Sequence, residues 1–479
     1  MSLKKQALHG FIWTYAEQSG GQIINFFVNI ILARTLFPDD FGVLGILYVF
    51  ITIANVLVEG GMKTSIIRKK NTDENDYSSV FFANILISIS VYIIIFLAAP
   101  FISDFYRKPE FTLLLRFFSL TIIIQAFVFV QSAILTKNLD FRKQTLMKIP
   151  SIFLSSILGI VLAFMNYGIW SLVWMYLTQA FFWALFHWLF SDWKPKWVFD
   201  KALFKFHFDF GYKLTIVEIL NSITANIYQI IMGQYYTLRD VGYYTQSLTV
   251  RQLPISNIYG AASKLLLPIF SKVQDDEARL VNTYQKMLSI LMVVIAPILM
   301  FIAFFSEQII VFLYSEKWKL AAPFLFYLAI AGIFNVVYSF NTSVLSIIGD
   351  SKLILRIEIL NKVQRFIFII VALILMLSID YFLFSILLAS IVNYLIVDFY
   401  ISKYLKIKKF LLIFLFLRFL IFSGFSVLCS YVFFNNFKFI LIPVLNLALS
   451  FFVGALFYVA LVYFFNKKTI SDLIELVKK

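Results

Sequence analysis

The chain has 479 residues, of which 61% are hydrophobic and only 14% are charged. A soluble protein needs about 25% charged residues to cover its surface, so this composition excludes a soluble protein and indicates a polytopic membrane protein. The formal net charge of +15 does not indicate nucleic-acid binding. Lys and Arg cluster in short connections between apolar runs, which is typical of the positive-inside distribution. With one cysteine and three scattered histidines, we expect neither a disulfide framework nor a metal site.

Apolar runs predict an all-α integral membrane protein with fourteen spanning helices and short connections. Starting the chain in the cytoplasm places most of the Lys and Arg on the inner side, which predicts that both termini are cytoplasmic. The expected spans are residues 10–34, 41–60, 78–103, 110–136, 146–165, 168–190, 206–233, 240–270, 282–305, 319–347, 355–377, 381–402, 410–434 and 439–465.

The first expected span carries a stripe of amide side chains. Successive members are three or four residues apart, so at about 100° per residue they share one face of a helix. Polar groups that face hydrocarbon cost free energy unless they find partners or water. We therefore expect the stripe to line a polar cavity, although amides that bridge packed helices would be an alternative. The stripe consists of Gln18, Gln22, Asn25 and Asn29, with Glu17 beside it.

A similar register returns 200 residues later, in the seventh expected span. There Glu218, Ser222, Ala225 and Gln229 follow the same spacing, and the turns that follow also match. The pattern predicts a parallel repeat: two pseudo-twofold-related six-helix lobes, residues 1–200 and 201–408, and two further helices in residues 409–479. The matching turn residues are Asp40 and Asp240, Gly42 and Gly242, and Gly60 and Gly260; Tyr106 and Tyr314 match at an offset of 208.

Four segments of the chain resemble the polysaccharide transporter family of the multidrug/oligosaccharidyl-lipid/polysaccharide exporter superfamily, in particular its colanic-acid exporter type. They are LARTLFPDDFGVLGILYVF (32–50), TSIIRKKNTDENDYSSVFFANI (64–85), NYGIWSLV (166–173) and VRQLP (250–254). The resemblance implies a flippase that moves polyprenyl-diphosphate-linked oligosaccharides, such as O-antigen, capsule or exopolysaccharide units, across the bacterial inner membrane. It also implies pathway partners, namely a glycan polymerase and glycosyltransferases.

The candidate site residues fall into three groups. The expected substrate cavity contains the stripe of the first span together with Ser222, Gln229, Tyr244 and Ser247. Arg251, in the middle of the eighth span, is the candidate for the lipid diphosphate, because a guanidinium matches phosphate oxygens bidentately; a buried ion pair is the alternative. Glu17 and Glu218 are candidates for coupling to H⁺ or Na⁺, and structural ion pairing is their alternative. No cofactor is expected.

Two other functions remain as alternatives at this point. A cation-coupled multidrug exporter would share the fold but would need an apolar cavity, whereas the stripe is rich in amides. A membrane polysaccharide polymerase or ligase would carry catalytic groups on a sizeable outer loop, and the connections are short. The chain has no phosphate-binding P-loop, HExxH or GxSxG motif, so we expect it not to be an enzyme.

Overall fold

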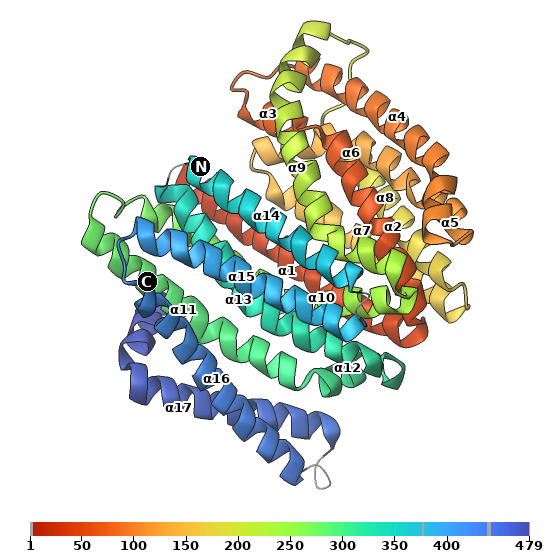
Figure 1. The fold of residues 1–479 in the computed structure, drawn as a ribbon. Coiled ribbons are helices and arrows are strands. Elements are labelled where there is room, and N and C mark those ends of the chain that lie inside the picture. Colours follow the sequence, from red (N-terminus) through yellow and green to blue (C-terminus); the bar gives the residue numbers. More distant parts are fainter. Residues whose placement is uncertain (1–2, 350, 376–377, 438–441, 479) are drawn as a thin grey trace. The chain divides into compact units, whose positions relative to one another are not determined.

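The computed structural model describes residues 3–349, 351–375, 378–437 and 442–478, and these residues are almost entirely helical. They form two compact units, Met1–Thr245 and Gln246–Lys479, and α10 runs from the first into the second (Figure 1). The lobe boundaries expected from the repeat, residues 1–200, 201–408 and 409–479, stay predictions.

The described residues of the first unit form nine helices and the start of a tenth. Aspartates begin several of them, since a carboxylate accepts hydrogen bonds from the unpaired amides of the first turn. Asp73, Asp140 and Asp200 cap α4, α7 and α9 in this way. The helices are α1 (Leu3–Thr35), α2 (Pro38–Glu59), α3 (Met62–Arg68), α4 (Glu74–Tyr106), α5 (Glu110–Phe118), α6 (Leu120–Lys137), α7 (Phe141–Phe164), α8 (Ile169–Phe190), α9 (Lys201–Tyr235) and α10 (Leu238–Phe270).

Packing in the first unit follows helix pairs. The most extensive packing joins α7 to α8 and to α1, while α6 packs on α4 and α8. Helix α9 packs along α2 and α4. Each helix buries one face in the unit and leaves large apolar side chains exposed on another, as expected of helices that face lipid.

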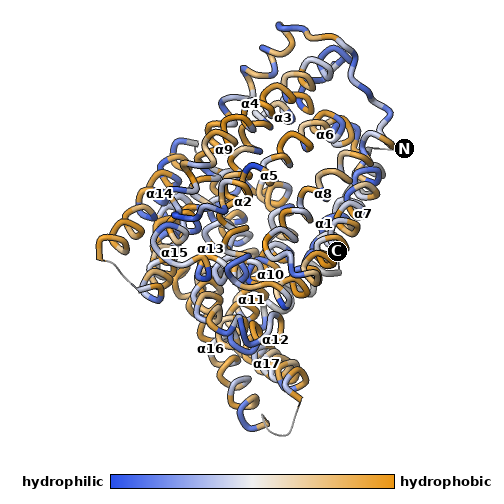
Figure 2. The backbone as a smooth tube through the Cα atoms, turned by 90° about the vertical axis from the view of Figure 1, so that its right-hand side faces the viewer, coloured by the Kyte–Doolittle hydropathy of each residue, from blue (hydrophilic) through white to orange (hydrophobic). Residues whose placement is uncertain are grey.

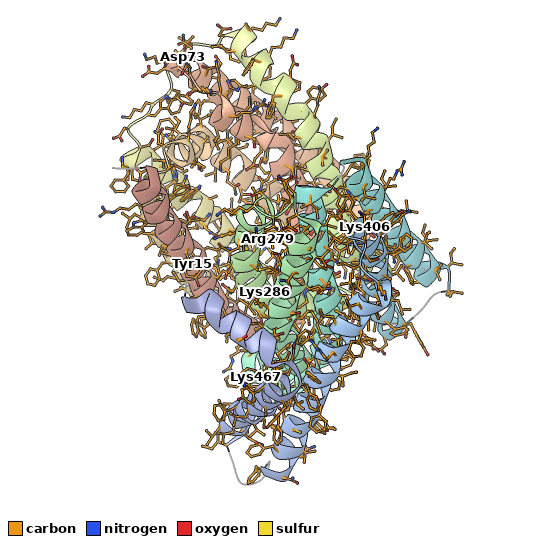
Figure 3. The ribbon with its side chains drawn as sticks, turned by 90° about the vertical axis from the view of Figure 1, so that its left-hand side faces the viewer. Tyr15, Asp73, Arg279, Lys286, Lys406 and Lys467 are labelled. Carbon is orange, nitrogen blue, oxygen red and sulfur yellow. The ribbon has the colours of Figure 1, made fainter. Side chains whose placement is uncertain are left out.

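The second unit packs around α13 (Ala322–Ile348), which contacts α11 (Glu277–Phe304) and α15 (Ile379–Tyr404). Its core is apolar, but Tyr284 donates a hydrogen bond of 2.9 Å to the Asn341 side chain inside it. Lys406, labelled in Figure 3, pairs with Glu277 at 2.6 Å and ties the end of α15 to the start of α11. The remaining elements are α12 (Ser306–Tyr314), a 3₁₀ turn η1 (Glu316–Ala321), α14 (Ser351–Ile374), α16 (Lys409–Phe437) and α17 (Pro443–Lys478).

The chain is a multi-pass membrane protein. Among the described residues, eleven helices are long and apolar enough to cross a bilayer. Over its described residues, every expected span coincides with a long helix or a pair of consecutive helices; residues 376–377 and 439–441 of the expected spans lie outside the described residues. The exact count of fourteen stays a prediction. The three long helices outside those eleven are α1, α10 and α14, which carry polar or charged side chains within their length. Figure 2 shows hydrophobic residues along most helices and hydrophilic residues mainly at their connections.

Three details differ from the sequence-based expectation. The span expected at 110–136 is two helices, α5 and α6, that meet at Ser119. The connection after α2 contains the short helix α3, and α12 lies between α11 and η1. Both short helices, α3 and α12, lie between apolar spans, where hydropathy carries no separate signal for them.

The repeat at an offset of 200 is visible in local geometry. The backbone N–H of Phe37 donates to the Asp40 carboxylate at 3.0 Å, and that of Thr237 donates to the Asp240 carboxylate at the same distance. The third glycine pair does not match. Gly60 ends α2 in the left-handed conformation (φ 52°), whereas Gly260 lies inside α10. The expected equivalence of these two glycines is therefore wrong, because the helix that follows the second turn continues to Phe270.

Candidate functional site

The amide stripe of α1 lies beside the face that packs on the rest of the first unit. The packing face is marked by Gly21, where a Cβ would lie 3.3 Å from the Ile152 side chain of α7. In the stripe, Gln18 and Asn25 are exposed, Gln22 and Asn29 are half-buried, and the Asn29 side-chain oxygen is buried without a hydrogen-bond partner. Two of the four amides are therefore accessible, and that the stripe forms the wall of a polar cavity stays a prediction.

The corresponding side chains of α9 have mixed environments. Ser222 is buried and its hydroxyl has no hydrogen-bond partner. Gln229 donates to the Thr245 hydroxyl at 3.3 Å, and Glu218 is exposed. Because α1 packs on α7 while α9 packs on α2 and α4, the two stripes lie on helices with different neighbours. That both stripes line one water-filled cavity stays a prediction.

The three candidates on α10 lie within or next to tight packing. Tyr244 and Ser247 are buried, and the Ser247 hydroxyl donates to the Ala321 carbonyl at 3.2 Å. The aliphatic part of Arg251 lies against α13, where a Cβ on Gly332 would be 3.3 Å from it. The Arg251 guanidinium donates to the Gln252 side chain at 3.5 Å. The role of Arg251 in binding a diphosphate stays a prediction.

A polar cavity opens inside the first unit, and we call it the first-bundle pocket. Its volume is about 120 Å³. Its lining comes from five helices: α2, α3, α4, α6 and α8. Half of the twelve lining side chains are polar, which is unusual for the interior of an apolar helical bundle. The polar lining consists of Asn55, Glu59, Lys63, Asn84, Gln125 and Ser132, with Trp183 on the α8 side.

Hydrogen bonds fix part of this lining. The Asn84 side-chain NH₂ group donates to the Val58 carbonyl at 2.6 Å. The side-chain oxygen of Asn84 is buried and has no hydrogen-bond partner. The Lys63 ammonium donates to the Ser132 hydroxyl at 3.3 Å. Asn84 is therefore a polar group held inside the bundle with an unused acceptor, which is uncommon in folded proteins.

Charged side chains gather next to the pocket. Glu17 of α1 interacts electrostatically with Lys148 of α7 and with Lys63. The Lys148 ammonium lies 4.6 Å from the centre of the Trp183 ring. The fully buried His187 ring packs edge-on against Trp183, and its Nε2 has no hydrogen-bond partner. The candidate coupling residue Glu17 therefore interacts with one residue of the pocket lining, Lys63, whereas its expected counterpart Glu218 is exposed on α9.

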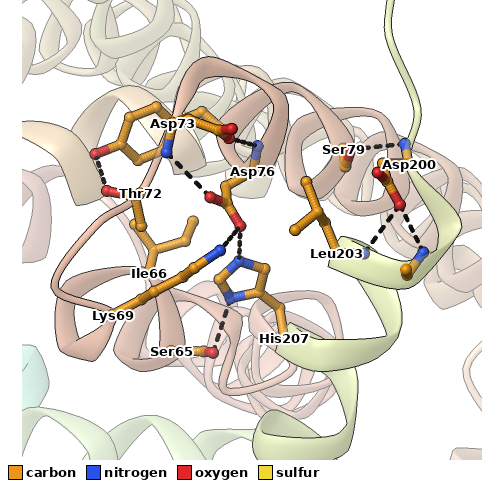
Figure 4. Close-up of polar contacts among 12 residues, drawn as sticks. Ser65, Ile66, Lys69, Thr72, Asp73, Asp76, Ser79, Asp200, Leu203 and His207 are labelled. Atoms are coloured by element: carbon orange, nitrogen blue, oxygen red, sulfur yellow. Dashed lines mark hydrogen bonds and ion pairs between the residues drawn. The ribbon is translucent and has the colours of Figure 1, made fainter.

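A second polar cluster joins α3 and α4 to α9 (Figure 4). An Asp76 carboxylate oxygen lies 2.5 Å from the Lys69 ammonium and 3.0 Å from His207 Nε2, while His207 Nδ1 lies 2.8 Å from the Ser65 hydroxyl. The order Asp–His–Ser is that of a hydrolytic triad. However, each of these three side chains is at most 3% exposed, so no substrate reaches the serine. The cluster acts as a structural link between helices.

Lysine and glycine contacts strengthen the same link. Lys137, at the end of α6, donates to the carbonyls of Ile66 and Lys69 at 3.1 and 2.6 Å. A Cβ on Gly211 of α9 would lie 1.9 Å from the Gly60 carbonyl oxygen, so the two backbones touch.

Among the residues that the structure describes, no group of three His, Cys, Asp or Glu side chains could hold a metal ion.

Comparison with known proteins decides the family. Residues 31–323, more than half of the chain, match the family model described as "Polysaccharide biosynthesis protein". The chain belongs to this family.

Three known proteins resemble this chain in sequence or in fold. It is 24% identical to the teichuronic acid biosynthesis protein TuaB of Bacillus subtilis, over 74% of this chain and 73% of TuaB. It is 26% identical to the succinoglycan biosynthesis transport protein ExoT of Rhizobium meliloti, over 67% of this chain and 65% of ExoT. Its fold resembles that of the lipid II flippase MurJ in an inward closed conformation, with a TM-score of 0.74, 17% identity, and coverage of 97% of this chain and 100% of the MurJ chain.

Several residues of this family member's polar interior were not anticipated from its sequence. Gln125 and Asn84 lie within expected spans, and polar side chains inside a span are themselves a signal of function. Glu59 and Lys63 lie at the end of a span, where charges are common and carry little information. The sequence therefore offered a signal for the two amides of the pocket but none for its two charged residues.

Proposed function

We propose that this chain is a flippase for a polyprenyl-diphosphate-linked oligosaccharide. The match to the polysaccharide biosynthesis family over residues 31–323 carries the proposal. The names of TuaB and ExoT place these relatives in the biosynthesis of teichuronic acid and of succinoglycan, and that of ExoT describes transport. The likeness to MurJ supports a fold that is used for moving a lipid-linked sugar.

Physical chemistry explains why such a substrate needs a protein. A glycan has many hydrogen-bonding groups and cannot cross roughly 30 Å of hydrocarbon unaided. Helices with apolar outer faces and polar inner groups, such as α1, would offer the glycan partners while the polyprenyl tail stays in lipid. Alternating access between two lobes would then move the headgroup from one side to the other.

The proposal extends to location and energy source. The chain would lie in a bacterial inner membrane with both termini in the cytoplasm, receive its substrate from glycosyltransferases and pass it to a glycan polymerase. Coupling to H⁺ or Na⁺ would involve Glu17, which interacts electrostatically with Lys148 and Lys63. The amide side chains of α1 favour a flippase for a lipid-linked glycan over a drug exporter, because a drug exporter would need an apolar cavity.

Reconstitution into liposomes tests the proposal. The liposomes would contain the lipid extract of cells that make the polysaccharide, and membrane-impermeant periodate would oxidise the glycans that are exposed outside. With the protein, we expect glycans of both leaflets to be oxidised, and without it only those of the outer leaflet. Equal oxidation with and without the protein, under an imposed H⁺ or Na⁺ gradient, would show that it is not a flippase for this lipid.

Cysteine scanning tests the shared cavity. Single cysteines at positions 15–30 and 215–230, in a Cys429→Ser background, should react with small polar thiol reagents at helical periodicity. We expect the maxima at Gln18, Gln22, Asn25 and Asn29 and at Glu218, Ser222 and Gln229, because water would reach that face of each helix. Maxima on the opposite face of α1 would contradict the cavity.

A further inference from the structure

The first-bundle pocket has a function that neither the family nor the amide stripes assign. We propose that it binds one sugar ring of the transported glycan, with the ring stacked on Trp183. This inference rests on the proposed flippase function and specifies where part of the glycan is held. The pocket belongs entirely to the first unit, so the site is complete within Met1–Thr245.

The size of the pocket fits a group larger than an ion. Each water takes about 30 Å³ of liquid, so about 120 Å³ corresponds to roughly four waters. A desolvated monovalent cation would leave most of this volume unfilled. The pocket is also too small for a whole oligosaccharide, so a single ring is the unit that it accommodates.

The polar lining supplies both kinds of hydrogen-bonding group that a sugar requires. Each sugar hydroxyl donates one hydrogen bond and accepts others, so its site needs acceptors as well as donors. Glu59 and the side-chain oxygen of Asn55 can accept, while Lys63 has three donors, of which Ser132 takes one. Gln125 can do both, and its side chain is exposed to the pocket.

The indole of Trp183 supplies an apolar wall. The C–H groups of a pyranose carry partial positive charge, and an aromatic face carries partial negative charge, so the two surfaces attract when they stack. Contacts with Lys148 and with the edge of His187 hold the indole in place. A pocket for an apolar drug would lack the amides, and a cation site would not place the Lys63 ammonium in its wall.

A second cavity of the same unit gives a contrast. A groove of about 460 Å³ between α5, α6 and α8 is lined by seven apolar side chains and Thr178. It contains Trp174, which is on the same helix as Trp183 and is 42% exposed. This groove suits lipid chains, so Trp174 is a matched control for Trp183.

Protection of a pocket cysteine tests the inference. The variant Ser132→Cys would be made in the Cys429→Ser background, and its reaction with a small polar thiol reagent would be followed in proteoliposomes. We expect the lipid extract of glycan-producing cells to slow this reaction at least fivefold. An extract from cells that lack the first glycosyltransferase of the pathway should have no effect, because its lipids carry no sugar.

Substitution of the stacking residue gives a second measurement. For Trp183→Leu we expect the concentration of extract needed for half-maximal protection to rise about tenfold, and for Trp174→Leu less than twofold. Thermal unfolding of both variants in detergent shows whether they fold. If Trp183→Leu does not fold, Gln125→Leu replaces it, because Gln125 is exposed and its loss removes only hydrogen bonds to the ring.

The outcomes separate the two proposals. If the wild-type protein flips the lipid-linked glycan but the extract does not protect Ser132→Cys, the pocket is wrong and the flippase function stands. If both extracts protect equally, the pocket holds a group other than sugar, and the inference is overturned as well. If the wild-type protein flips no glycan, the proposed function fails and the sugar pocket fails with it.

Discussion

The crossing of α2 and α10 offers a quantitative test of the packing. Gly42 and Gly242, which are 200 residues apart, face each other where the two helices begin. A Cβ on Gly42 would lie 1.8 Å from the Leu238 carbonyl oxygen, and one on Gly242 would lie 2.0 Å from that of Pro38. Carbon and carbonyl oxygen normally approach to about 3.3 Å, so Gly42→Ala forces the backbones apart by roughly 1.5 Å.

The expected cost follows from that separation. Overpacking a tight site costs about 1–3 kcal/mol, and here the atom in the way is backbone, which cannot rotate aside. For a unit of this size we expect a fall in the thermal midpoint of roughly 3–10 °C. Gly242→Ala should have a similar effect. The double variant should cost less than the sum, because either methyl group alone already opens the contact.

Gly260→Ala is the matched control. A Cβ at Gly260 has no atom within 4 Å, and the residue lies inside α10. Alanine is favoured over glycine in a helix by about 0.5–1 kcal/mol, so this change should raise the midpoint slightly. Thermal unfolding in one detergent, followed by tryptophan fluorescence, compares the variants. Equal midpoints for Gly42→Ala and Gly260→Ala would refute the close crossing.

Three further predictions follow from the polar residues. Asp76→Ala should destabilise the protein by about 3–5 kcal/mol, because it leaves His207 and Lys69 without their carboxylate, and thermal unfolding that matches the wild type would contradict this. Arg251→Ala should reduce glycan export at least tenfold while Arg251→Lys keeps part of it, since both carry charge but only arginine binds phosphate bidentately; full export by a stable Arg251→Ala protein would exclude the diphosphate role. A cysteine at Lys406 should be protected from an impermeant reagent added outside intact cells, and its labelling there would show that the α15–α16 connection is not cytoplasmic.

Local properties of the sequence determined the class of this protein and the positions of its helices. Hydropathy along a single helix is set by that helix alone, so the apolar runs located the long helices without knowledge of their neighbours. The repeat was also readable, because the turn chemistry of Asp40 and Asp240 depends on residues three positions away. The expected match of Gly60 with Gly260 was wrong, because Gly60 ends α2 whereas Gly260 lies inside α10.

The polar contacts were decided only by tertiary structure. Asp76 and His207 are 131 residues apart, and no spacing within the sequence relates them. The first-bundle pocket needs side chains from five helices to converge, among them Asn84 of α4 and Trp183 of α8. The amide stripe showed which face of α1 is polar, but what that face meets depends on helix packing. In a chain so rich in apolar residues, many helix faces could pack together, and only the folded arrangement decides which buried polar groups, such as Asp76 and His207, find partners.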